Sequence, residues 1–165
     1  MKKKIWIIML VLVALCLFSE NILAAEKHWA EGDLHNLKSK YQIEVREDLD
    51  QPAGKELQEK ILKLTGIKKR PQNKLSRFKI FHYMVEELAV KTLSEQECRE
   101  ILRDFQDTCA YCKKSNEILG KAKKAGLLRG RSTVGGLIMS IDKPVTRAEL
   151  GVLAVRYLKI KETLK

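Results

Sequence analysis

The apolar residues of this chain recur every three or four positions along six separate stretches, and this spacing constrains the fold more than any other feature of the sequence. The stretches are 30–41, 55–65, 76–89, 94–105, 118–125 and 150–158. A period near 3.6 residues places the apolar side chains on one face of an α-helix, whereas a half-buried strand alternates apolar and polar residues. No segment of comparable length alternates in that way. The pattern therefore predicts an all-α fold.

Glycine and proline predict where these helices begin and end. Gly66, Gly126 and Gly130 stand just past apolar helical faces, where glycine takes the left-handed conformation that ends a helix. Prolines precede three of the helices at Pro52, Pro71 and Pro144. The interval 130–143 reads as a loop, and we expect it to fold back and bury Leu137 and Ile138.

The first 25 residues have the plan of a secretory signal peptide. Lys2, Lys3 and Lys4 precede an apolar run from Ile5 to Phe18, and small residues follow at 24–25, where cleavage is expected. The run is short for a membrane-spanning helix, so an uncleaved anchor is the weaker interpretation, and a lipid-modified Cys16 is weaker still because bulky Leu15 precedes it. Residues 26–165 then form one exported domain.

The chain is strongly basic. Its formal net charge is +11, which becomes +9 after removal of residues 1–25. An exported protein with this charge is suited to anionic envelope polymers or anionic lipid headgroups, although a solvated basic surface has the same composition. The export signal, and not the charge, disfavours nucleic acid as a partner.

The cysteines do not indicate a disulfide scaffold, a metal site or a redox centre. Cys98, Cys109 and Cys112 remain after cleavage, and an odd number leaves at least one thiol free or paired between chains. A zinc site would need a fourth ligand with suitable spacing, and a redox C-x-x-C would need a strand before it. A local disulfide, or a disulfide between Cys98 and either Cys109 or Cys112, is the simplest interpretation. No cofactor is expected, and no catalytic motif predicts an enzyme.

The segment 142–158, DKPVTRAELGVLAVRYL, contains a helix start with one residue left unexplained. Thr146 is placed as the N-cap, and Glu149 three residues later completes a capping box. Arg147 lies in the first turn, where the helix dipole disfavours a positive charge. Ser76 and Arg77 repeat the hydroxyl–arginine pair before another apolar helix. The unexplained arginine suggests a binding role.

These residues belong to a longer pattern that resembles the S-layer homology family. The family's units read approximately F-x-D, W-A, A-G-[IL]-[IL]-x-G, D-G-x-F and P-[IV]-T-R-A-E-[FL]. This chain has Phe105 and Asp107, then 125–130 and 144–150 intact, whereas the glycine-rich loop reads GGLI at 135–138. A second unit opens at His28-Trp29-Ala30. Its helix-start motif is either Gly54-Lys55-Glu56 or the better Ser76-Arg77. The resemblance places units at about 28–90 and 104–160.

The resemblance implies a pseudo-threefold helical domain. Grooves beside its helix starts would bind anionic secondary cell-wall polysaccharide at the surface of a Gram-positive-type bacterium. The ligand-binding residues implied in this chain are Arg147, Thr146, Arg77, Ser76 and Trp29. Each also has a structural interpretation. The arginines can be surface charges or salt-bridge partners, the hydroxyl residues can act as caps only, and Trp29 can be a core anchor.

Two other functions stay open at the level of the sequence. A degenerate copy could have lost sugar binding and serve as a protein-interaction module, which predicts an exposed apolar patch and an expendable Arg147. A membrane-surface protein held by an uncleaved N-terminus is the third class.

Overall fold

The structure is a computed structural model, and it describes residues 28–45, 48–108 and 113–164. The chain divides into two units, Met1–Glu31 and Gly32–Lys165, and the second of them carries the fold. The predicted signal peptide at 1–25 lies outside the described residues. None of the helices within the described ranges combines the length and the apolar character needed to cross a membrane.

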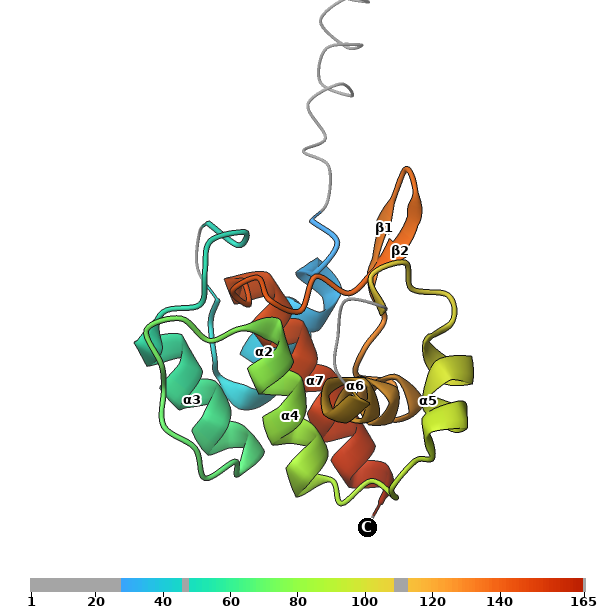
Figure 1. The fold of residues 1–165 in the computed structure, drawn as a ribbon. Helices are drawn as coiled ribbons and strands as arrows, with labels where there is room; N and C mark the ends of the chain where they lie inside the picture. The colour runs from blue at the N-terminus through green and yellow to red at the C-terminus, as the bar shows by residue number, and fades with distance from the viewer. Residues whose placement is uncertain (1–27, 46–47, 109–112, 165) are drawn as a thin grey trace, which may run out of the picture. The chain divides into compact units, whose positions relative to one another are not determined.

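The prediction of a helical protein is confirmed. The described residues contain six helices and one two-stranded hairpin (Figure 1). In chain order the elements are α2 (Glu31–Tyr41), α3 (Lys55–Thr65), α4 (Arg77–Glu87), α5 (Glu95–Leu102), α6 (Lys113–Lys124), β1 (Arg131–Thr133), β2 (Gly136–Ile138) and α7 (Arg147–Thr163).

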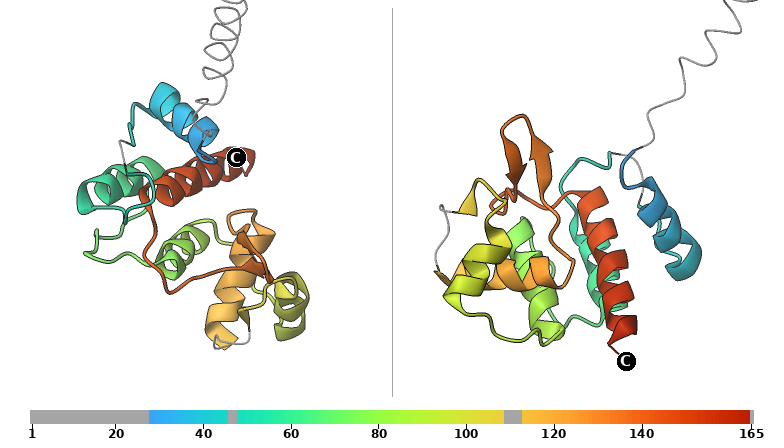
Figure 2. Two further views of the ribbon diagram at one scale, coloured as in Figure 1. Left: turned by 90° about the horizontal axis from the view of Figure 1, so that it is seen from above. Right: turned by 90° about the vertical axis from the view of Figure 1, so that its right-hand side faces the viewer.

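The last helix, α7, is the most deeply buried element of the second unit. It lies beside α3, while α6 lies against both α4 and α5 (Figure 2). Leu150, Leu153, Ala154 and Tyr157 are buried as their spacing predicts, but Val152 is buried as well. A helix that is apolar on most of its circumference is covered on most sides. Periodicity alone therefore underestimated how much of α7 is enclosed.

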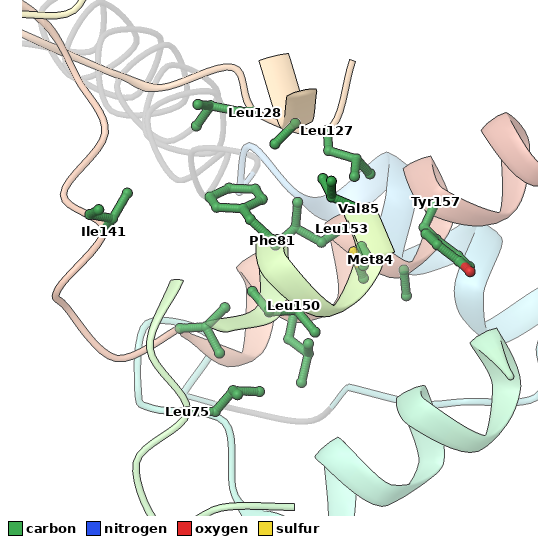
Figure 3. Packing of buried hydrophobic residues seen from close by; sticks show 14 of the residues in the cluster. Leu75, Phe81, Met84, Val85, Leu127, Leu128, Ile141, Leu150, Leu153 and Tyr157 are labelled. Atoms are coloured by element: carbon green, nitrogen blue, oxygen red, sulfur yellow. The ribbon is translucent and has the colours of Figure 1, made fainter. Parts of the chain in front are cut away.

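The core forms where side chains from α4, the segment after α6 and α7 point toward one another (Figure 3). Phe81, Met84, Leu127, Leu150 and Tyr157 are at most 2% exposed. Burying a large apolar side chain stabilises the folded state by about 1.5–3 kcal/mol. This cluster therefore contributes to the stability of the unit that contains the starts of α4 and α7.

Most of the helix ends lie at the residues that the sequence indicated. The carboxylate of Glu149 accepts a hydrogen bond from the backbone N–H of Thr146 at 3.1 Å, and the Thr146 hydroxyl accepts from the N–H of Glu149 at 3.3 Å. Ser76 accepts from Lys79 in the same way, and Ser94 caps α5. Gly66 and Gly126 end α3 and α6 in the left-handed conformation, with φ of 77° and 83°. Gly130 is left-handed as well, with φ 78°, but it directly precedes β1, so its prediction as a helix end is wrong.

The interval 130–143 differs from the prediction because it contains the hairpin. β1 and β2 pair antiparallel, with Arg131 opposite Ile138 and Thr133 opposite Gly136. Strands of three residues are too short to show alternation in a sequence. Leu137 and Ile138, which we expected to be buried, are only half-buried. The buried side chains are instead Met139 and Ile141, at 0% and 2% exposure.

Asp107 fixes the end of this hairpin to the rest of the unit. Its carboxylate accepts hydrogen bonds from the backbone N–H groups of Met139 and Ser140 at 2.9 Å each. The N–H of Gln106 donates to the carbonyl of Leu137 at 2.9 Å. The segment that leads into α7 is therefore held in place before the helix begins.

The starts of α4 and α7 dock onto turns with the same hydrogen-bond pattern. At α7, the N–H groups of Arg147 and Ala148 donate to the carbonyls of Gln51 and Leu49 at 2.9 and 3.0 Å. At α4, the N–H groups of Arg77 and Phe78 donate to the carbonyls of Lys143 and Ile141, at 3.0 Å each. At both helix starts, two successive N–H groups donate to carbonyls that lie two residues apart, and the second N–H group binds the earlier of the two carbonyls.

Candidate ligand groove at the start of α7

A groove of about 490 Å³ lies beside the start of α7 and includes the side chain that the sequence left unexplained. Its wall is formed by the segment after α2, the first turns of α3 and Arg147. The lining residues are Gln42, Ile43, Glu44, Val45, Gly54, Glu56, Leu57, Lys60 and Arg147. Clefts of this size are typical of sites for small ligands or short polymer segments. The structure therefore places Arg147 in a concave surface.

Local hydrogen bonds fix the backbone of Arg147. Thr146 is extended, with φ −79° and ψ 166°, and its cap holds the first turn of α7. The backbone N–H groups of Arg147 and Ala148 are bound to carbonyls, and that of Glu149 to the Thr146 hydroxyl. These three N–H groups are therefore not available to an anion at this helix start. An anion in the groove would have to bind to side chains.

The groove has charges of both signs. Arg147 and Lys60 contribute positive charge, and Glu44 and Glu56 contribute carboxylates. Lys60 pairs with Glu56 at 2.6 Å, and Glu44 pairs with Lys38 at 2.7 Å. Such a lining can bind an acidic group through the cations and hydroxyl groups through the carboxylates. Exposed ion pairs of this kind contribute little to stability, so a ligand can rearrange them at low cost.

Sequence reasoning missed Lys60. It follows Glu56 by four residues, a spacing that places both on one face of α3. That signal predicts an ordinary surface ion pair and does not indicate that Lys60 and Arg147 line the same groove. The neighbourhood of Arg147 and Lys60 depends on the docking of α7 onto 49–53, which local sequence does not encode.

Ser76 and Arg77 do not line this groove. Ser76 caps α4, as predicted, and accepts from the N–H of Lys79 at 3.3 Å. The Arg77 side chain is 8% exposed and donates to the Glu149 carboxylate at 2.5 Å. Arg131 of β1 donates to the same carboxylate oxygen. Glu149 therefore joins the starts of α4 and α7 to the hairpin, and the position of Arg77 fits the structural interpretation better than ligand contact.

Trp29 is 61% exposed, which contradicts its interpretation as a core anchor. Its ring lies 5.5 Å from that of His28, and both residues belong to the unit Met1–Glu31. Thr146 is half-buried and acts as the cap that positions Arg147.

The cysteine and histidine side chains form no second site in the described part of the chain. Cys98 is buried, and its burial, followed by the charges of Glu117 and Glu97, raises the pKa of its thiol. Cys109 and Cys112 lie outside the described residues, so the predicted disulfide stays a prediction. No cluster of histidine, cysteine and acidic side chains within 28–45, 48–108 and 113–164 is arranged to hold a metal ion. His82 is partly exposed and lies 3.2 Å from Glu86.

Comparison of the chain with protein-family models, with curated proteins and with solved structures finds no match.

Proposed function

We propose that this is an exported protein of the bacterial cell envelope that binds an anionic secondary cell-wall polysaccharide through the groove beside α7. The observation that carries the proposal is the position of Arg147, which lines the groove together with Lys60. The planar guanidinium offers two parallel N–H groups to a carboxylate or phosphate, which a compact ammonium does not. Glu44 and Glu56 can accept hydrogen bonds from sugar hydroxyl groups in the same groove.

The backbone pattern at the helix starts supports a domain of the S-layer homology type. The caps of α3, α4 and α7 are Gly54, Ser76 and Thr146, and all three are extended, with ψ of 163°, 159° and 166°. Ser94 at the start of α5 is extended too, so the docking pattern and not the cap conformation distinguishes these starts. The starts of α4 and α7 share one docking pattern. At α3 the hydrogen bonds to carbonyl groups come from a side chain. The amide of Gln58 donates to the carbonyls of Ala53 and Gln72, where α4 and α7 use backbone N–H groups. We propose that these are three unequal copies of one helix start.

The alternative function, a protein-interaction module, has less support. In the described ranges the exposed large hydrophobic side chains are Trp29, Val134 and Leu164, which belong to three different segments. A protein-docking surface is more often a contiguous apolar patch. We therefore place glycan binding first.

Co-sedimentation of the purified protein with cell walls tests the proposal. The walls are used before and after removal of their secondary polysaccharide, and the variants are Arg147→Ala, Arg147→Lys and Arg103→Ala. Arg103 is a matched control because its side chain is 79% exposed and does not line the groove. We expect stripping to abolish binding and Arg147→Ala to weaken it by about tenfold, the loss of one charge-assisted hydrogen-bonded contact.

The two arginine substitutions distinguish recognition from charge. Arg147→Lys keeps the charge but loses the paired donors, so we expect it to bind closer to the alanine variant than to the wild type. Arg103→Ala should bind as the wild type does. Binding that persists on stripped walls, or that falls equally in all three variants, would leave the interaction module as the better interpretation.

A further inference from the structure

Gln42, directly after α2, has a backbone conformation that glutamine rarely adopts. Its φ is 56°, in the left-handed region. Its N–H donates to the carbonyl of Lys38 at 3.0 Å, and the N–H of Ile43 donates to the carbonyl of Leu37 at 3.4 Å. This is a left-handed helix stop, where glycine is usual because it has no Cβ atom to crowd the backbone. A glutamine that occupies this position in spite of the cost calls for an explanation.

Other helices of this chain end in the same conformation without a long side chain. α3 and α6 are followed by Gly66 and Gly126, with φ of 77° and 83°. α4 is followed by Ala89, with φ 48°, whose side chain is a single methyl group. Compared with these three ends, the end of α2 differs in having a polar side chain with both donors and an acceptor.

The neighbours of Gln42 fix the position of its backbone. Tyr41 and Ile43 are partly buried and pack against the hydrophobic core, whereas Gln42 itself is exposed. The amide of Gln42 makes no hydrogen bond with any residue of the ranges 28–45, 48–108 and 113–164. The side chain therefore starts from a fixed point, and its amide is available to a ligand.

Gln42 lines the same groove as Arg147. Among the described residues of the lining, Gln42 has the one side chain that is polar and uncharged. Arg147 and Lys60 can only donate hydrogen bonds, while the carboxylates of Glu44 and Glu56 can only accept them. An amide does both, so it can donate to one sugar hydroxyl group and accept from its neighbour.

We propose that Gln42 is a specificity-determining residue of this groove, and that its amide binds hydroxyl groups of the sugar unit whose acidic group Arg147 holds. The inference rests on the proposed function of the groove. Arg147 attracts any acidic group, whereas a site that hydrogen-bonds a hydroxyl group discriminates against a ligand that lacks it. Glycine would suit the left-handed helix end better but would remove the amide, which explains why the strained residue is retained.

Co-sedimentation with cell walls at about 1 M salt, where the general attraction of the positive charge is screened, tests this role. We expect Gln42→Gly to bind about fivefold more weakly, the loss of the amide hydrogen bonds, although its melting temperature rises by about 2–4 °C as the strain is relieved. Gln42→Asn keeps an amide and tolerates the left-handed conformation, so it should regain part of the affinity. Ala89→Gly is the matched control, because Ala89 is left-handed but does not line the groove. It should also melt higher, and it should bind as the wild type does.

The possible failures can be told apart. Unchanged binding by Gln42→Gly, with Arg147→Ala still impaired, would overturn the role of Gln42 and leave the proposed function standing. A lower melting temperature of Gln42→Gly, or weaker binding by Ala89→Gly, would assign the loss to the helix end and not to the amide, which also overturns the role. Wild-type protein that binds equally to walls with and without their secondary polysaccharide would overturn the proposed function itself, and this inference with it.

Discussion

At the scale of single residues, Glu149 joins more parts of the fold than a cap alone requires, because its carboxylate binds Arg77, Arg131 and the start of α7. It is 8% exposed, completes the cap of α7 and accepts from Arg77, which is 7% exposed. Glu149→Gln keeps an oxygen for the cap but removes the carboxylate charge that pairs with the buried guanidinium of Arg77. Removing one partner of a buried pair is strongly destabilising, so we expect a loss of about 3 kcal/mol in the free energy of unfolding. Urea denaturation measures this loss.

Glu97→Gln is the matched control for that substitution. Glu97 holds the same third position of a capping box in α5, where its carboxylate accepts from the N–H of Ser94 at 2.8 Å. Its side chain is exposed and neutralises no buried arginine. We expect only a small change in the urea midpoint. Equal losses for the two variants would show that capping alone, and not the ion pair with Arg77, accounts for the effect.

The residues at the starts of α4 and α7 and in the candidate groove divide into those that the sequence could predict and those that it could not. Thr146 and Glu149 were predictable as a cap because they interact across three positions of one turn. Arg147 was noticeable because it conflicts with the dipole of its own helix. The ion pair of Arg77 was not predictable, because its partner Glu149 lies 72 positions away. The presence of Lys60 and Arg147 in one groove likewise depends on how separate segments dock.

At the scale of elements, the turn between α6 and the hairpin determines how both pack. A Cβ atom at Gly130 would lie 2.4 Å from Phe105 and 2.8 Å from Leu137, and the residue has φ 78°. Gly130→Ala therefore combines backbone strain of about 1–2 kcal/mol with overpacking of about 1–3 kcal/mol. We expect a total destabilisation of about 2–5 kcal/mol. Thermal unfolding followed by circular dichroism measures it.

Gly126→Ala separates the two causes, because Gly126 has a similar φ of 83° but no atom within 4 Å of the added methyl group. This variant should lose only the backbone contribution, about 1–2 kcal/mol. If the two variants were equally destabilised, close packing of the hairpin against Phe105 would not matter. The difference between them therefore measures how firmly the hairpin is fixed to the helices.

Sequence predicted the helices better than it predicted the hairpin, and the reason is physical. Each helix repeats its apolar spacing over two or more turns and ends at a cap or a glycine, so the signal accumulates along the chain. β1 and β2 have three residues each, and the hairpin is held in position by contacts with Asp107 and Gln106, which lie outside it. A short element that is stabilised by residues elsewhere in the chain has no recognisable pattern in its own sequence.

At the scale of the whole molecule, binding to cell walls should depend on salt concentration differently when it comes from the net positive charge and when it comes from contacts in the proposed groove. The formal net charge of +11 attracts any anionic surface, and this attraction is screened over about 8 Å at physiological ionic strength and about 3 Å at 1 M salt. Direct contacts between Arg147 and a ligand in the groove are screened much less. We therefore expect wild-type binding to unstripped walls to fall with added salt to a plateau above zero.

The Arg147→Ala variant identifies the source of that plateau. At low salt it keeps all but one of the positive charges, so its binding should approach that of the wild type. At high salt the screened attraction disappears, and only the contacts in the groove remain to hold the protein. We expect the variant to lose the plateau, whereas Arg103→Ala, which removes an equal charge elsewhere, should keep it. Parallel curves for the two variants at every salt concentration would mean that the protein adheres by charge alone, without recognition in the groove.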